Sequence, residues 1–173
     1  VLCLAAPTGG VVAGYVHPKQ ADGLPGTGRM AATVALRPAP AAGCDLVRLR
    51  VIAAHLARHT VAAQPRFLTV GSIPAETLRK EREIFRAAHL EQVGPKKTGI
   101  VDEKVMDKIL DGKTQKFYQE TVLACQELVA PQVASADGKT EQKPLPVAEW
   151  LQAEAKALGL EQIILEDFRL AVL

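Results

Sequence analysis

The spacing of apolar residues changes along this chain, from β-rich runs at the start to helical repeats in the middle. Residues 11–17 and 29–36 are rich in Val and Ala and flank a Gly/Pro-rich stretch, which predicts two strands joined by a long connection. Pro38 and Pro40 follow, and we expect them to end the second strand. The start of the chain therefore predicts a β-hairpin.

Helical spacing begins at Asp45, a residue type that favours the N-cap. We expect this first helix to end at Pro65. A second helix is predicted from Pro74, since proline suits the first helical turn. The apolar positions that define the first helix are Leu46, Leu49, Ala53, Leu56 and Thr60.

Two further helices are predicted at residues 101–110 and 113–129, separated by Gly112. Residues 131–144 are polar and predict a flexible connection. A last helix running to Gly159 and a strand from residue 162 follow.

This order predicts an α+β fold, a small antiparallel sheet packed by helices with an inserted helical hairpin. We expect residues 1–73 to form the first part of an α+β core subdomain. Residues 74–130 would form a helical hairpin that protrudes from it. Residues 131–173 would supply a linker and the last helix and strand that complete the core.

Composition narrows the classes of function. The chain has 173 residues, 48% hydrophobic and 23% charged, as in an ordinary soluble globular protein. Its formal net charge of +2 is too small for a general affinity for nucleic acid, which needs many Lys and Arg contacts to phosphates. No apolar run approaches the roughly 20 residues that span a bilayer. We therefore expect neither nucleic acid nor a membrane as a direct partner.

Titratable residues do not form a recognisable catalytic or metal-binding pattern. Cys3, Cys44 and Cys125 are far apart and odd in number, which disfavours a disulfide framework or a zinc site and favours reduced thiols. His55 and His59 lie one helical turn apart, but the zinc-protease motif needs Glu directly after the first His, and Leu follows His55. We predict no metal, no cofactor and no enzymatic activity.

His59 has two interpretations. It lies at the edge of the apolar face of the predicted helix, whereas His55 points further toward solvent. A histidine in such a place is either a polar contact for a partner or a satisfied, half-buried group, and the pattern alone favours the second.

Several segments, in the expected order, resemble the elongation factor Ts family. Gly112–Val129 resembles that family's "ekiveGrl.KF..E..LleQ.fv", and Ile73–Ile84 resembles "vPaevlekEreI". His59–Phe67 resembles "mHvAAanPrf", with the same spacing from His to Pro. Gly14–His17, residues 28–36 and residues 147–168 also resemble family segments.

The resemblance implies a guanine-nucleotide exchange factor that binds the GTPase elongation factor Tu and promotes release of GDP. It also implies an α+β core that carries a protruding pair of helices, and it leaves open a homodimer through that protrusion. The resemblance places His59 against elongation factor Tu. We hypothesise that the neighbouring turn also engages it, through Gln64, Pro65, Arg66 and Phe67.

One alternative function stays open. A scaffold or ribosome-associated module could keep this fold without promoting exchange, since two family segments, "LR..TGagm.dCK.AL" and "tDFVar", have no counterpart in these 173 residues. The Ala-rich, divergent sequence favours a mitochondrion as the compartment, with a plastid or the bacterial cytoplasm as alternatives.

Overall fold

The structure is a computed structural model of the whole chain. It describes residues 3–18, 28–40, 43–93, 103–129 and 145–173. The connection predicted at residues 131–144 lies outside these ranges.

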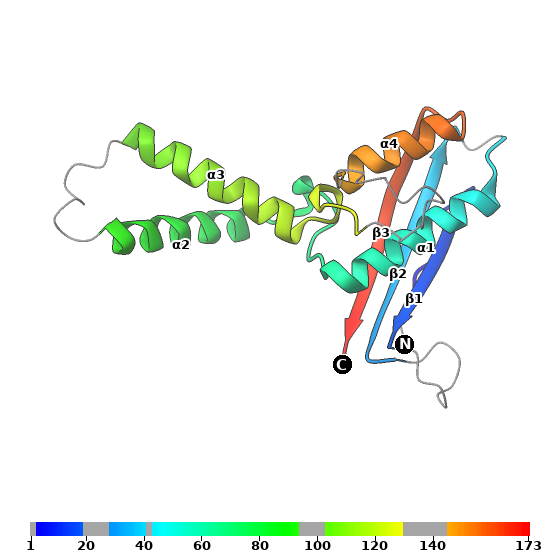
Figure 1. The fold of residues 1–173 in the computed structure, drawn as a ribbon, viewed down its shortest axis with the longest axis horizontal. Coiled ribbons are helices and arrows are strands. Elements are labelled where there is room, and N and C mark those ends of the chain that lie inside the picture. Colours follow the sequence, from blue (N-terminus) through cyan, green and yellow to red (C-terminus); the bar gives the residue numbers. More distant parts are fainter. Residues whose placement is uncertain (1–2, 19–27, 41–42, 94–102, 130–144) are drawn as a thin grey trace, which may run out of the picture.

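Three antiparallel strands form the sheet, in the order β1-β2-β3. They are β1 (Val11–His17), β2 (Met30–Ala39) and β3 (Gln162–Val172). The central strand β2 pairs with β1 from Val11 opposite Leu36 to His17 opposite Met30. The last strand therefore returns to the first hairpin, and the predicted α+β fold is confirmed (Figure 1).

The prediction that Pro38 ends the second strand is wrong, because β2 continues to Ala39. Pro38 lies opposite Ile163 of β3, whereas pairing with β1 stops at Leu36. At Pro38 the strand has one hydrogen-bonded neighbour instead of two. A proline without an N–H is tolerated at such an edge.

Helix α1 (Leu46–Ala63) packs on β1 and β2. The side chain of Asp45 caps its first turn, since Oδ1 accepts hydrogen bonds from the backbone N–H groups of Val47 at 2.9 Å and Arg48 at 3.1 Å. The main core joins this helix to the sheet and to helix α4 (Val147–Ala157). Its fully buried side chains are aliphatic, and they include Val34, Leu36, Leu49, Leu56, Leu123 and Val147.

Helices α2 (Ala75–Val93) and α3 (Glu103–Thr121) extend away from the sheet as a pair (Figure 1). The predicted break at Gly112 is wrong, because α3 runs through this residue without interruption. A glycine costs a helix interior about 1 kcal/mol relative to alanine. Burial of Met106, Leu110 and Phe117 along one side of α3 outweighs that cost.

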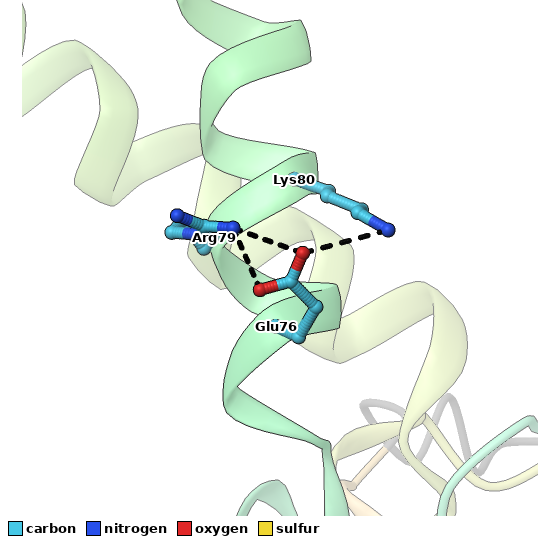
Figure 2. Close-up of polar contacts among 3 residues, drawn as sticks. All are labelled: Glu76, Arg79 and Lys80. Carbon is cyan, nitrogen blue, oxygen red and sulfur yellow. Dashed lines mark hydrogen bonds and ion pairs between the residues drawn. The ribbon is translucent and has the colours of Figure 1, made fainter.

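The first turn of α2 is stabilised by charge pairs at helical spacing. Figure 2 shows the Glu76 carboxylate between two cations, with Arg79 Nη2 at 2.9 and 2.7 Å from its two oxygens and Lys80 Nζ at 3.5 Å. All three residues are exposed, so each pair contributes about 0.2–0.5 kcal/mol. The Glu76–Lys80 contact follows from the i,i+4 spacing in the sequence.

A second, smaller core lies at the base of the projecting helices. Its buried residues are Ile73, Phe117 and Val122, and Phe67 and Phe85 pack against them. The rings of Phe85 and Phe117 meet edge to face, with centroids 6.4 Å apart. The two helices are thus fixed to the rest of the molecule at one end.

Candidate partner-binding site

The residues predicted to bind a partner lie where α1 ends and the chain turns toward the second core. Gln64 is the C-cap of α1 and adopts a left-handed conformation with φ of 47°. Its backbone N–H donates to the Thr60 carbonyl at 3.0 Å. Gln64 and Arg66 are exposed, Pro65 is buried and Phe67 is half-buried. The turn therefore exposes two polar side chains to solvent, whereas its apolar side chains are buried or half-buried.

The turn is held against the end of α3. The backbone N–H groups of Arg66 and Phe67 both donate to the Thr121 carbonyl, at 2.8 and 3.1 Å, and Leu123 N–H donates to the Phe67 carbonyl at 2.9 Å. The Arg66 guanidinium lies 5.5 Å from the centre of the Phe67 ring, a cation–π distance. Four backbone and ring contacts thus fix the direction in which Arg66 projects.

The apolar pattern predicted His59 at the edge of the apolar face of its helix, but the structure buries it. Its side chain is only 1% exposed, because the segment after α3 covers it. The backbone N–H of Val129 donates to Nδ1 at 3.2 Å, and Nε2 lies 3.1 Å from Oε1 of Gln126. Since Nδ1 accepts a hydrogen bond, the proton of the neutral ring lies on Nε2, which donates to Gln126.

Burial lowers the pKa of His59, and the hydrogen bond with Gln126 opposes this shift more weakly. His59 is therefore a neutral, fully hydrogen-bonded group in the free chain. His55 is less buried, and its ring lies 6.4 Å from that of Trp150. Burial and the nearby Arg58 charge lower the pKa of His55, against the Glu154 carboxylate, which raises it.

Gln126 is the residue at this site whose role the sequence did not predict. It is 4% exposed. Its side-chain amide donates to the Ala63 carbonyl at 3.2 Å and to the Glu120 carbonyl at 2.8 Å. The "LleQ.fv" pattern contains this glutamine, and that was the one signal in the sequence that singled it out.

Within the described ranges, no three His, Cys, Asp or Glu side chains gather to hold a metal ion. His55 and His59 face different neighbours, Trp150 and Gln126. None of the helices in the described part of the chain is long and apolar enough to cross a membrane.

Comparison with known proteins identifies the family. The family model described as elongation factor TS matches residues 2–149. The chain belongs to the elongation factor Ts family. The elongation factor Ts of Nautilia profundicola is 32% identical over 171 residues, which are 98% of this chain and 46% of that protein.

Two other bacterial relatives are also elongation factor Ts proteins. Elongation factor Ts of Orientia tsutsugamushi is 34% identical over 152 residues, 88% of this chain and 41% of that protein. The Ehrlichia ruminantium protein is 35% identical over 127 residues, 73% of this chain and 39% of that protein. The chain spans less than half the length of these elongation factor Ts proteins.

Proposed function

We propose that this chain binds elongation factor Tu and promotes release of its GDP through the turn Gln64–Phe67. The observation that carries the proposal is the geometry of this turn, which presents Gln64 and Arg66 to solvent on a backbone fixed to two helix ends. Membership of the elongation factor Ts family supports this choice of partner. No bond is made or broken in this function, so the protein is not an enzyme.

The mechanism is competition between two ligands of one GTPase. If this chain binds the nucleotide-free form more tightly than the GDP-bound form, linkage requires that it weaken GDP by the same factor. Gln64, Arg66 and the exposed part of Phe67 would make the direct contacts. Pro65 and His59 are both buried in the free chain. They would contribute to binding indirectly, by supporting the backbone of the turn.

The test is release of a fluorescent GDP analogue from elongation factor Tu, with and without this chain. We expect faster release, and tighter binding to the empty GTPase than to the GDP-loaded one in an equilibrium titration. Arg66→Ala should weaken binding about tenfold, as loss of a charged contact does. Arg50→Ala, at an exposed position near the start of α1, is the matched control and should bind like the parent.

A scaffold without exchange activity is the second candidate. It is favoured by the burial of His59, because a buried side chain makes no direct contact with a partner. A stable complex with elongation factor Tu that leaves GDP release unchanged would support the scaffold. Absence of any complex would rule out both functions.

The compartment is a separate proposal. A mitochondrion is still the prediction from composition, whereas the relatives described above are bacterial and favour the bacterial cytoplasm. Colocalisation of the tagged protein with a mitochondrial marker in its host cell would decide between them.

We also propose a division of the chain into two structural units. Residues 74–130 would act as a protrusion distinct from a core made of residues 1–73 and 131–173. The pair α2 and α3, which extends away from the sheet (Figure 1), supports this division. Self-association of the chain as a homodimer would use the protruding helices.

A further inference from the structure

Gln126 connects the two helix ends on either side of the exposed turn. We infer that it is a positioning residue for partner binding: its side chain fixes the turn Gln64–Phe67 and the ring of His59 at once. This inference rests on the proposed function of the turn.

The first step concerns the ends of the helices. The last carbonyls of an α-helix have no partner within the helix and need one from elsewhere. Ala63 is the last residue of α1, and Glu120 lies one residue before the end of α3. Gln126 donates one amide hydrogen to each of these carbonyls. One side chain therefore caps two helices.

The second step concerns the turn between these carbonyls. Gln64 follows Ala63 directly, and the Arg66 and Phe67 N–H groups donate to the carbonyl of Thr121, which follows Glu120. One flank of the turn is thus adjacent in sequence to a carbonyl that Gln126 holds. The other flank is hydrogen-bonded to the residue that follows the second carbonyl. A shift of the Gln126 amide would move both flanks.

The third step concerns His59. The amide of Gln126 has one orientation that suits all its partners, with the NH2 group toward the two carbonyls and the oxygen toward the ring. That oxygen can accept only, so it selects the ring tautomer with the proton on Nε2. The same tautomer leaves Nδ1 free to accept from Val129. All the polar groups of this buried network are therefore satisfied.

Replacement of Gln126 by methionine tests the inference. Methionine has a similar length but provides neither the two donors nor the acceptor oxygen. Gln119→Met, at an exposed position on α3, is the matched control. Two measurements use the chain alone: hydrogen exchange at the Arg66 and Phe67 amides, and the tautomer of His59 from the nitrogen NMR shifts of its ring.

In Gln126→Met we expect the two amides to exchange at least about tenfold faster. The excess of the Nε2-protonated tautomer should become smaller, since only the Val129 N–H then selects it. Acceleration of GDP release from elongation factor Tu should fall by a similar factor, while Gln119→Met matches the parent in every measurement. A folded Gln126→Met protein with parental amide exchange and parental GDP release would overturn the inference.

Gln126→Glu separates the two parts of the role, and it serves also if the methionine variant does not fold. Its carboxylate still accepts from Nε2 of His59 but donates to neither carbonyl. We expect a retained tautomer together with fast amide exchange at Arg66 and Phe67. Unchanged amide protection would overturn the positioning role.

The two proposals can fail separately. If the parent chain does not accelerate GDP release, the proposed function fails, and the amide and tautomer measurements still decide whether Gln126 fixes the turn. If the parent is active and the variants lose the network without any loss of activity, the function stands and the positioning role is wrong.

Discussion

At the scale of single residues, the difference between the expected and observed burial of His59 has a plain physical cause. The spacing of apolar residues along α1 predicts which of its side chains pack on the sheet. It does not describe the cover supplied by Gln126 and Val129, because Gln126 lies 67 positions further along the chain. By contrast, the cap at Asp45 depends on residues two and three positions away, and the sequence predicted it.

His59 gives the stability of the fold a pH dependence of defined sign. Burial lowers the pKa of His59 in the folded chain, whereas in the unfolded chain it is about 6.5. As the pH falls below this value, the unfolded chain takes up a proton before the folded one. The free energy of unfolding is therefore at its full value above about pH 7 and decreases as the pH falls through about 6.5.

Denaturant unfolding at pH values on either side of about 6.5 measures this effect. The midpoint should be lower at the acidic pH, and His55, whose pKa is also lowered, adds to the same trend. His59→Gln should make the dependence less steep, because the neutral amide takes up no proton in either state. A parental slope in His59→Gln would contradict the assignment.

Replacement of Gln64 by glycine should change stability and partner binding in opposite directions. A residue with a side chain pays a conformational cost at φ of 47°, which glycine avoids. Gln64→Gly should therefore raise the free energy of unfolding by up to about 1 kcal/mol, with part of the gain offset by the greater freedom of glycine in the unfolded chain. The same change removes one of the two exposed side chains of the turn and should weaken binding to elongation factor Tu.

Thermal unfolding and titration with elongation factor Tu measure the two effects of Gln64→Gly. The control is Gln115→Gly, at an exposed position inside α3, where glycine should cost about 1 kcal/mol. A lower melting temperature for Gln64→Gly would show that its left-handed backbone is not strained.

At the scale of elements, the sequence predicted which segments form helices and strands better than where they end. The strand at residues 11–17 and the start of α1 are confirmed, because alternation and capping are local. The errors at Pro38 and Gly112 share a cause: both residues disfavour an element in isolation. Pairing with β3 in one case and burial of one side of α3 in the other override that local preference.

Gly112 should therefore be a weak point of α3 that alanine improves. A Cβ atom built there meets no other atom within 4 Å, so alanine brings no clash. Gly112→Ala should stabilise the protein by about 0.5–1 kcal/mol, since alanine is the better helix former. Chemical denaturation with an unchanged m-value measures the gain.

Gly159→Ala is the matched control for Gly112→Ala, because Gly159 has a positive φ of 69° at the end of α4. It should destabilise the protein. Destabilisation by both changes would mean that α3 is not a continuous helix at Gly112.

At the scale of the whole molecule, two cores meet at the proposed binding turn. The main core is built from the sheet, α1, α4 and the segment after α3, without any residue of the projecting part of the hairpin. Phe67 belongs to the second core, while Ala63, four residues earlier, ends a helix of the first. Removal of the outer hairpin should therefore leave both the sheet and the turn intact.

The ion pair between Arg82 and Asp111, with Nη1 and Oδ1 2.9 Å apart, marks a place where the hairpin can be shortened. These two residues lie side by side on α2 and α3, so a short Gly/Ser linker can replace residues 83–110 without stretching the chain. We expect a shortened protein that unfolds cooperatively and still binds elongation factor Tu, because the main core and the turn are retained.

The shortened protein also tests the homodimer. If the chain associates through its protruding helices, sedimentation should show a concentration-dependent dimer for the parent and a monomer for the shortened form. Exposed Ile84, 58% accessible on α2, lies in the removed part, so the point variant Ile84→Asp serves as a control that keeps the hairpin. A dimer that survives the deletion would place the contact elsewhere, because residues 83–110 would then contribute nothing to it.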